Sequence, residues 1–190
     1  MSEPMLDLHV PRRDDFPIRQ AWLADPEFMH YNVAWDVEFP GYSRATGCIE
    51  WPEQQWDAFE ERLNRPAAEQ GYFYVLDTRI GEAVGHVHYT VEERIASIGF
   101  NVVPSRRGEG LGAAFLALLL ERIRTDTAAV VVINEFEDER LPARRVHEKA
   151  GFHPDPETNT TFGRPTRIWS LHLERNAPEP RVAATDPAPA

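Results

Sequence analysis

The amino-acid sequence predicts a mixed α/β (α+β) fold, with a mostly antiparallel central sheet of about six to seven strands flanked by helices. Three observations carry this prediction. Three consecutive strand-like segments between residues 72 and 103 are separated by turn signals, as in an antiparallel meander. A long amphipathic helix follows them. After this helix, residues 128–134 (AAVVVIN) form a β-branched run that is typical of a strand buried on both faces.

The N-terminal third is expected to supply one strand and two helices. Apolar and polar residues alternate over Met5–Val10, which predicts a strand, and Asp14 or Asp15 is placed to cap the first helix. The insert at about 29–51 is rich in aromatic residues, Gly and Pro without a clean period, so we expect an ordered loop with a helical turn. Trp51-Pro52-Glu53 then opens a second helix, with proline at an early position.

The central and C-terminal elements follow from turn signals and periodicity. We expect strands at 72–77, 83–91 and 96–103, and a long helix that starts after a glycine-rich turn and ends near Thr125. A short helix at 141–150 should end at Gly151, because glycine is the usual residue just past a helix C-terminus. Closing strands are predicted at 152–153 and 166–174.

Composition limits the class of protein. The 190 residues suit one domain, which we place at 1–174, and the Pro- and Ala-rich residues 175–190 are expected to be a disordered tail. The net charge of -11 argues against a nucleic acid or an anionic membrane as partner. A single cysteine, Cys48, excludes an intramolecular disulfide and a thiolate metal cluster. Without a signal peptide or a membrane-length apolar run, we expect a cytoplasmic protein, and whether it forms a homodimer stays open.

The most informative segment is the glycine-rich turn between a predicted strand and the long helix, Val102–Gly112 (VVPSRRGEGLG). Glycines at 108, 110 and 112 allow a sharp turn and close approach of a ligand to the backbone. The first turn of the following helix offers free N–H groups and the positive end of the helix dipole. We therefore expect an anion site suited to a pyrophosphate, to which Arg106 and Arg107 add positive charge.

Two familiar phosphate-binding motifs do not match this turn. The Walker pattern requires Gly-Lys-Ser/Thr at the end of the loop, and the Rossmann fingerprint requires a different glycine spacing after the first strand of a βαβ unit. A glycine-rich turn that only connects strand and helix is the remaining alternative.

Two blocks resemble the GNAT superfamily of acetyltransferases. Residues 107–112 (RGEGLG) are similar to its R/Q-x-x-G-x-G/A cofactor motif, and 143–152 (ARRVHEKAGF) resemble its A-x-x-x-Y-E-K-x-G-F segment. The resemblance extends over roughly residues 5–174, without the insert. It implies a GNAT-type fold and an acetyl-CoA-dependent N-acetyltransferase. No metal is expected, because His86 and His88 are followed by no third ligand at useful spacing.

The resemblance also implies cofactor contacts. The backbone of Arg107, Gly108, Gly110, Leu111 and Gly112 would hold the pyrophosphate of coenzyme A. The strand edge near Val102 would pair with the pantetheine, and N–H groups around Phe100 to Val102 would face the developing oxyanion. Glu109 stands where the family often has a basic residue, so we expect it to point away from the phosphates. Arg140 replaces a frequent Asn.

His147 occupies the place of the family's usual Tyr, the acid that reprotonates the coenzyme A thiolate. An imidazole can donate that proton, and the alternative is a half-buried packing or hydrogen-bonding residue. The base that deprotonates the amine is predicted to be Glu135, directly after the fifth strand, with Glu137 and Asp138 as nearby candidates. His86 and His88, a water chain, or structural roles for both histidines stay open.

The acceptor pocket is expected to be lined by aromatic residues of the insert, above all Tyr31, Trp35 and Tyr42, although such residues can also simply close the core. Aromatic faces and carboxylates would suit a cation. The function predicted is direct acetyl transfer to a primary amine of a small, cationic molecule in a ternary complex. A protein acetyltransferase acting on Lys or an N-terminus, and a non-catalytic coenzyme A-binding regulatory module, are the alternatives.

Overall fold

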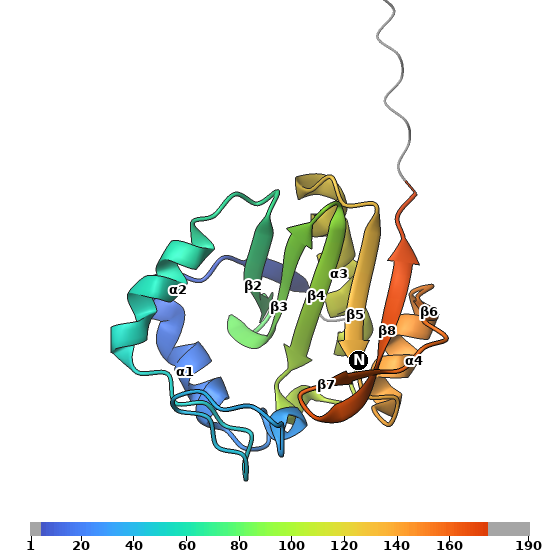
Figure 1. The fold of residues 1–190 in the computed structure, drawn as a ribbon. Helices are drawn as coiled ribbons and strands as arrows, with labels where there is room; N and C mark the ends of the chain where they lie inside the picture. Colours follow the sequence, from blue (N-terminus) through green and yellow to red (C-terminus); the bar gives the residue numbers. More distant parts are fainter. Residues whose placement is uncertain (1–4, 175–190) are drawn as a thin grey trace, which may run out of the picture.

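The sheet runs through the centre of the molecule, with helices on both of its faces (Figure 1). This computed structural model describes residues 5–174, so the predicted tail at 175–190 lies outside the described residues, as do residues 1–4. The strands are β1 (Leu6–His9), β2 (Gln70–Asp77), β3 (Glu82–Glu92), β4 (Ile95–Val102), β5 (Val131–Phe136), β6 (His153–Pro154), β7 (Asn159–Thr161) and β8 (Arg164–His172).

Four α-helices accompany the sheet within the described residues: α1 (Phe16–Ala24), α2 (Trp56–Leu63), α3 (Leu111–Asp126) and α4 (Leu141–Lys149). Single 3-10 turns stand at Arg13–Asp15, His30–Asn32, Glu53–Gln55 and Pro104–Arg106. The segment 29–51 contains one helical turn, His30–Asn32, and an isolated β-bridge between Tyr42 and Ile49, and the rest of it is loop.

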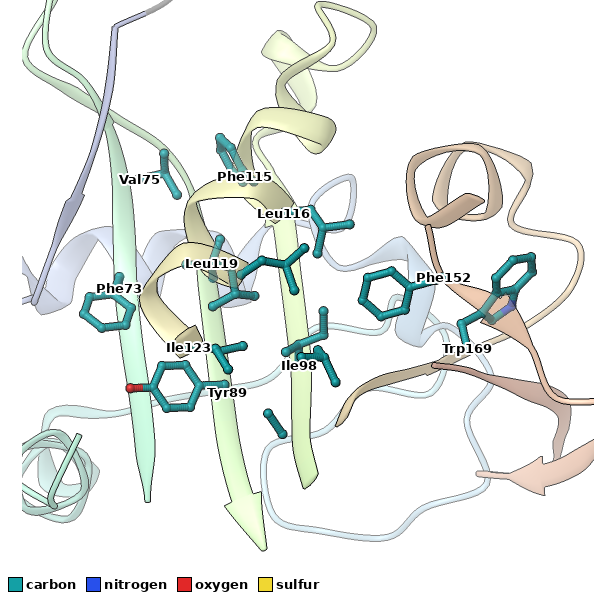
Figure 2. Close-up of a cluster of buried hydrophobic side chains, with 14 of the residues drawn as sticks. Phe73, Val75, Tyr89, Ile98, Phe115, Leu116, Leu119, Ile123, Phe152 and Trp169 are labelled. Atoms are coloured by element: carbon teal, nitrogen blue, oxygen red, sulfur yellow. The ribbon is translucent and has the colours of Figure 1, made fainter. Parts of the chain in front are cut away.

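Alternation along β2 divides the core between the two faces of the sheet. Phe73 and Val75 point to the face covered by α3, whereas Tyr72 and Tyr74 point to the face covered by α1 and α2. Figure 2 shows the α3 side chains Phe115, Leu116, Leu119 and Ile123 against the strands. Burying each of these side chains contributes about 1.5–3 kcal/mol, so α3 is firmly seated behind β3 and β4.

The opposite face holds a separate aromatic cluster. Phe16 of α1 packs against Trp51, Trp56 and Phe59 with ring centroids 5.2 to 5.7 Å apart. Trp51 is therefore a core residue. The cluster anchors both ends of the insert.

The order of strands is β1-β2-β3-β4-β5-β8-β6, with β7 paired to β8. All pairs are antiparallel except β4 with β5, which run parallel and pair only over Ile95–Ser97 and Val131–Ile133. Beyond these residues the two strands separate while both continue, β4 to Val102 and β5 to Phe136. The sheet therefore opens between them, at the end where α3 begins.

Two details of the sheet differ from the prediction. The fifth strand starts at Val131 rather than 128, and its residues are not buried on both faces, because the second face lines an opening rather than a helix. Within residues 5–174 the sheet has eight strands, where about six to seven were expected. The additional strand, β7, consists of Asn159–Thr161, whose polar composition gives no strand signal.

A substitution at Gly85 tests how tightly β3, β4 and α3 pack. A Cβ atom there would lie 2.1 Å from the Asn101 carbonyl oxygen and 2.6 Å from the Phe115 ring, at a φ of 154°. We expect Gly85→Ala to lower the free energy of unfolding by about 3 kcal/mol, measured by urea denaturation. Gly81 has a φ of 70° and open space around it, so Gly81→Ala should cost only about 1 kcal/mol. Equal losses would contradict this packing.

Candidate active site

The opening between β4 and β5 contains a cavity of about 300 Å³. It passes through the sheet, because its walls come from both faces. Gly99 and Phe100 of β4 lie on one side, and β5 contributes Asn134 to Glu137 on the other. The remaining wall is formed by Tyr31, Trp35, His86, His88, Arg140, Ala143, His147, Thr161, Phe162 and Thr166.

The glycine-rich turn presents bare backbone at one end of this opening. The N–H groups of residues 108 to 112 donate to no acceptor within the described part of the chain. Gly108 and Gly110 have φ values of 86° and 83°. Apart from each glycine and its two chain neighbours, no heavy atom of residues 5–174 lies within 4 Å of the position that a Cβ would take at Gly108 or Gly110. The turn is thus an open row of hydrogen-bond donors at a helix N-terminus, which suits a phosphate group.

Arg106 and Arg107 brace this turn instead of facing the space above it. Arg106 donates to Glu109 (2.8 Å) and to Asp77 (3.2 Å). Arg107 donates to the carbonyl oxygens of Val102 and Glu27, both at 3.2 Å. The expectation that these arginines add positive charge is therefore corrected for Arg106, whose charge is paired with two carboxylates. Glu109 points toward Arg106, and its orientation relative to a bound phosphate stays a prediction.

Asp77 connects the Arg106 side chain, and with it the glycine-rich turn, to the sheet. Its carboxylate, 1% exposed, lies at the end of β2 and accepts hydrogen bonds from Arg79 and Arg106. The bond from Arg79 is the largest cause that holds the pKa of Asp77 well below its usual range, and Arg106 adds to it. The carboxylate therefore stays charged across the physiological range, and the turn stays attached to the sheet.

His147 is buried and held by two hydrogen bonds. Its Nδ1 lies 2.8 Å from the Ala143 carbonyl oxygen, which can only accept, so Nδ1 carries the proton. Its Nε2 then accepts from the Asn134 side-chain amide at 3.0 Å. Burial is the main reason that its pKa is lowered. A neutral ring with both nitrogens engaged favours the hydrogen-bonding alternative, and the role of His147 as an acid stays a prediction.

Glu135 points into the cavity from β5. Its Oε1 accepts the hydroxyl protons of Thr161 at 2.6 Å and Thr166 at 2.5 Å. Within residues 5–174 it forms no ion pair, unlike Glu137, which pairs with Arg164 and Arg140, and Asp138, which pairs with Arg167. Of the three carboxylates considered as a base, only Glu135 has its charge uncompensated.

His86 and His88 line the cavity from β3 as neutral side chains. Burial lowers the pKa of His88 to about 4 and that of His86 well below its usual value. His88 Nδ1 lies 3.3 Å from the Gly99 carbonyl oxygen, and the His86 ring stacks on Tyr72 at 5.3 Å. His86 Nδ1 is buried with no hydrogen-bond partner among the described residues.

Two of the three aromatic residues predicted for the acceptor pocket line the cavity between β4 and β5. Tyr31 and Trp35 line the cavity, and the Arg140 guanidinium lies 5.3 Å from the centre of the Tyr31 ring. Tyr42 does not, because its hydroxyl donates to the Asn32 carbonyl oxygen at 2.6 Å and its ring faces a separate hollow with Phe39. The structure therefore gives Tyr42 a role in the shape of the insert.

The insert is fastened to the β7–β8 hairpin across the cavity. The rings of Trp35 and Phe162 lie 4.5 Å apart, and the Asp36 N–H donates to the Phe162 carbonyl oxygen at 2.9 Å. Arg164 donates to the Val33 carbonyl oxygen. These contacts make a clasp, defined by Trp35, Asp36 and Phe162, that closes the cavity on the side of α1 and α2.

Thr161, Thr166, Asn134 and Phe162 also line the cavity and could not be predicted from the sequence. Hydroxyl and amide side chains in a short polar segment carry no signal of their own, and only the strand register places them at the cavity. One sequence feature could have indicated the β7–β8 hairpin: Gly163, because glycine is preferred in two-residue hairpin turns. No cluster of three or more potential metal ligands occurs in residues 5–174, and none of the helices described there is long and apolar enough to cross a membrane.

Comparisons with known proteins agree with this geometry. The family model described as "Acetyltransferase (GNAT) domain" matches residues 6–153. No curated protein matches the chain in sequence.

Among solved structures, the fold is similar to the ribosomal-protein α-N-acetyltransferase RimL with coenzyme A, at 12% identity and a TM-score of 0.70, covering 90% of this chain and 96% of that one. It is also similar to spermidine N-acetyltransferase from Vibrio cholerae with coenzyme A and spermine (16%, 0.69, 88% and 95%). A third similar structure is aminoglycoside acetyltransferase AAC(6')-Ib with coenzyme A (17%, 0.64, 88% and 95%). At these identities the likeness concerns the fold.

Gly110→Val tests the row of free N–H groups. A valine disfavours the φ of 83° and projects into the open space, so the donors would be displaced. A hydrogen bond to a charged group contributes about 1.5–3 kcal/mol, so losing one or two should weaken coenzyme A binding by about 100-fold in calorimetry. Gly81→Val is the matched control, with the same backbone conformation and similar open space outside the site, and should bind normally. Undiminished affinity of Gly110→Val would contradict the site.

The buried neutral histidines predict acid sensitivity. An unfolded histidine has a pKa of about 6.5, whereas folded His88 titrates near 4, so the unfolded chain binds more protons between these values. Stability is therefore present above pH 6.5 and falls as the pH drops toward 4. For His88 alone, the loss from pH 7 to pH 5 is about 2 kcal/mol. His88→Gln should remove that part of the slope in urea unfolding at several pH values, and parallel slopes would contradict it.

Proposed function

The chain belongs to the GNAT acetyltransferase family and is an acetyl-CoA-dependent N-acetyltransferase, and we propose that its acceptor is the primary amine of a small molecule. The amine would bind in the cavity between β4 and β5, enclosed by the clasp, and attack the thioester directly in a ternary complex. The observation that carries this proposal is the uncompensated Glu135 carboxylate in that cavity.

The glycine-rich turn fits the pyrophosphate of coenzyme A, because it offers free N–H groups with open space before them. In the proposal, Gly108, Gly110, Leu111 and Gly112 hold the phosphates through the backbone, and Arg107 keeps the turn in place. Acetyl-CoA supplies the acetyl group as a thioester.

The unpaired edge of β4 is proposed to bind the acyl end of the cosubstrate. Since β4 pairs with β5 only up to Ser97, main-chain groups of the strand beyond that residue lack a strand partner on the β5 side. Those near Val102 are suited to pair with the pantetheine, and an N–H near Phe100 is suited to the thioester oxygen as negative charge develops on it. Removing such a donor costs about 3 kcal/mol in other enzymes.

Glu135 is proposed to hold the ammonium form of the acceptor and to take its proton. A protonated amine has no lone pair for attack, so a proton acceptor has to lie near the nitrogen. Glu135 meets this need because it lines the cavity, carries a negative charge, and lacks an arginine partner in the described chain. Transfer occurs directly or through one water molecule.

The size of the cavity favours a small acceptor. About 300 Å³ is at the lower end of ligand pockets, so the acetyl end of the cosubstrate and a few heavy atoms of an amine would fill it. Aromatic walls at Tyr31, Trp35 and Phe162 suit an ammonium or an apolar chain. The family match does not itself distinguish a small amine from a protein N-terminus, and a panel of acceptors would do so.

The test is a thiol-release assay over 1-aminobutane, 1,4-diaminobutane, spermidine, kanamycin and a peptide with free N-terminal and lysine amines. We expect turnover with at least one small amine and none with the peptide. Turnover of the peptide alone would instead assign a protein substrate, and no turnover at all would overturn the proposal.

Glu135→Gln should lower kcat about 100-fold with the best amine, because a positioned base contributes about 10²–10⁴-fold. The KM for acetyl-CoA should stay within about twofold, since the cofactor turn is untouched. Glu157→Gln, at an exposed position on the loop before β7, is the matched control and should retain full activity. Equal activity of Glu135→Gln and wild type would remove Glu135 from the reaction.

A further inference from the structure

The carboxylate of Glu135 is held from one side only. Both Thr161 and Thr166 contact the same oxygen, Oε1, at 2.6 and 2.5 Å. An ionised carboxylate can only accept, so each hydroxyl uses its one proton on Glu135. Two donors on one oxygen fix the rotation of the carboxylate about its last bond. The other oxygen, Oε2, has no donor within residues 5–174.

The β7–β8 hairpin places these two hydroxyls. Thr161 pairs with Arg164 across a two-residue turn in which Phe162 and Gly163 have φ values of 50° and 75°, as a type I′ turn requires. Asn159 pairs with Thr166, so residues 159, 161, 164 and 166 share one face of the hairpin. Thr161 and Thr166 are therefore diagonal neighbours, 3.2 Å apart at their oxygens, and both face β5.

The rest of the cavity offers no second free negative charge among the described residues. Glu137 lies 3.2 Å from Arg164 and 3.7 Å from Arg140. His86 and His88 are neutral, and the remaining lining residues are aromatic, small or polar side chains and the Arg140 guanidinium, none of which is negatively charged. An amine with one ammonium group would find one partner here, whereas a second ammonium group would enter without one, at the cost of its hydration.

We propose that Thr161 and Thr166 are positioning residues that direct Oε2 of Glu135 into the cavity, and that this arrangement selects acceptors with a single ammonium group. The inference rests on the proposed function, because only in that function does Glu135 contact a bound amine. It names the substrate class more narrowly: a small primary monoamine with an apolar or hydroxylated remainder, in preference to a polyamine.

The experiment measures steady-state kinetics of the full chain with 1-aminobutane and 1,4-diaminobutane, a matched pair that differs by one ammonium group. Wild type should give a kcat/KM about tenfold higher, or more, for the monoamine. Thr166→Val, which keeps the shape and removes the hydroxyl, should lower kcat about fivefold to tenfold, with the KM for acetyl-CoA within twofold. Thr161→Val should behave alike, and the double variant should approach Glu135→Gln.

Two controls separate positioning from folding. Thr166→Ser restores the hydroxyl and should recover kcat to within about twofold of wild type, which a merely structural role of the threonine methyl group would not do. Thr160→Val changes the exposed neighbour of Thr161 on the same strand and should leave the kinetics unchanged.

The outcomes distinguish the two proposals. Unchanged kcat in Thr166→Val, failure of Thr166→Ser to recover it, or a preference for the diamine overturns the inference while the acetyltransferase with a small-amine acceptor stands. A wild-type protein that acetylates no amine of the panel overturns both.

Discussion

The separation of β4 from β5 is the constraint on which the rest of this molecule depends. Two parallel strands that pair over three residues and then diverge leave hydrogen-bonding groups unpaired in the middle of a sheet, which is costly unless water or a ligand satisfies them. The divergence also opens the sheet to both of its faces at one place. In the proposed function, a cosubstrate at the start of α3 and an acceptor on the face covered by α1 and α2 would meet at this opening.

Two sets of side chains hold this opening in shape from opposite sides. On the cofactor side, Asp77 anchors Arg106, and Arg107 donates to the carbonyl oxygen of Glu27, just before the insert, so both arginines hold the framework in place. On the acceptor side, the clasp joins the insert to the β7–β8 hairpin. The proposed cofactor turn and the cavity wall are thus connected through residues 27–35.

The sequence predicted those parts of the fold that depend on local pattern. The meander, the long helix and the glycine turn follow from alternation, helical periodicity and backbone freedom, each of which is visible within about ten residues. β7 and the Thr161–Thr166 pair could not be predicted, because they depend on which strands become neighbours in space. The position of Tyr42 away from the cavity was not predicted for a related reason. Aromatic composition indicates that a loop is ordered, but not which of its rings faces a cavity. The pairing of Arg106 was not predicted in part because one of its two carboxylate partners, Asp77, lies 29 residues away in the chain.

The bare turn at residues 108–112 has a consequence for how this protein can change over generations. A binding surface made of amide groups needs no particular side chain to touch its ligand, so Gly108 and Gly110 matter for the conformation of the backbone. The side chains that matter are those that hold the turn in place, Arg106 with its partners Asp77 and Glu109. Substitutions in the wall of the cavity would therefore leave the proposed cofactor turn unchanged, as long as these glycines and this brace are kept.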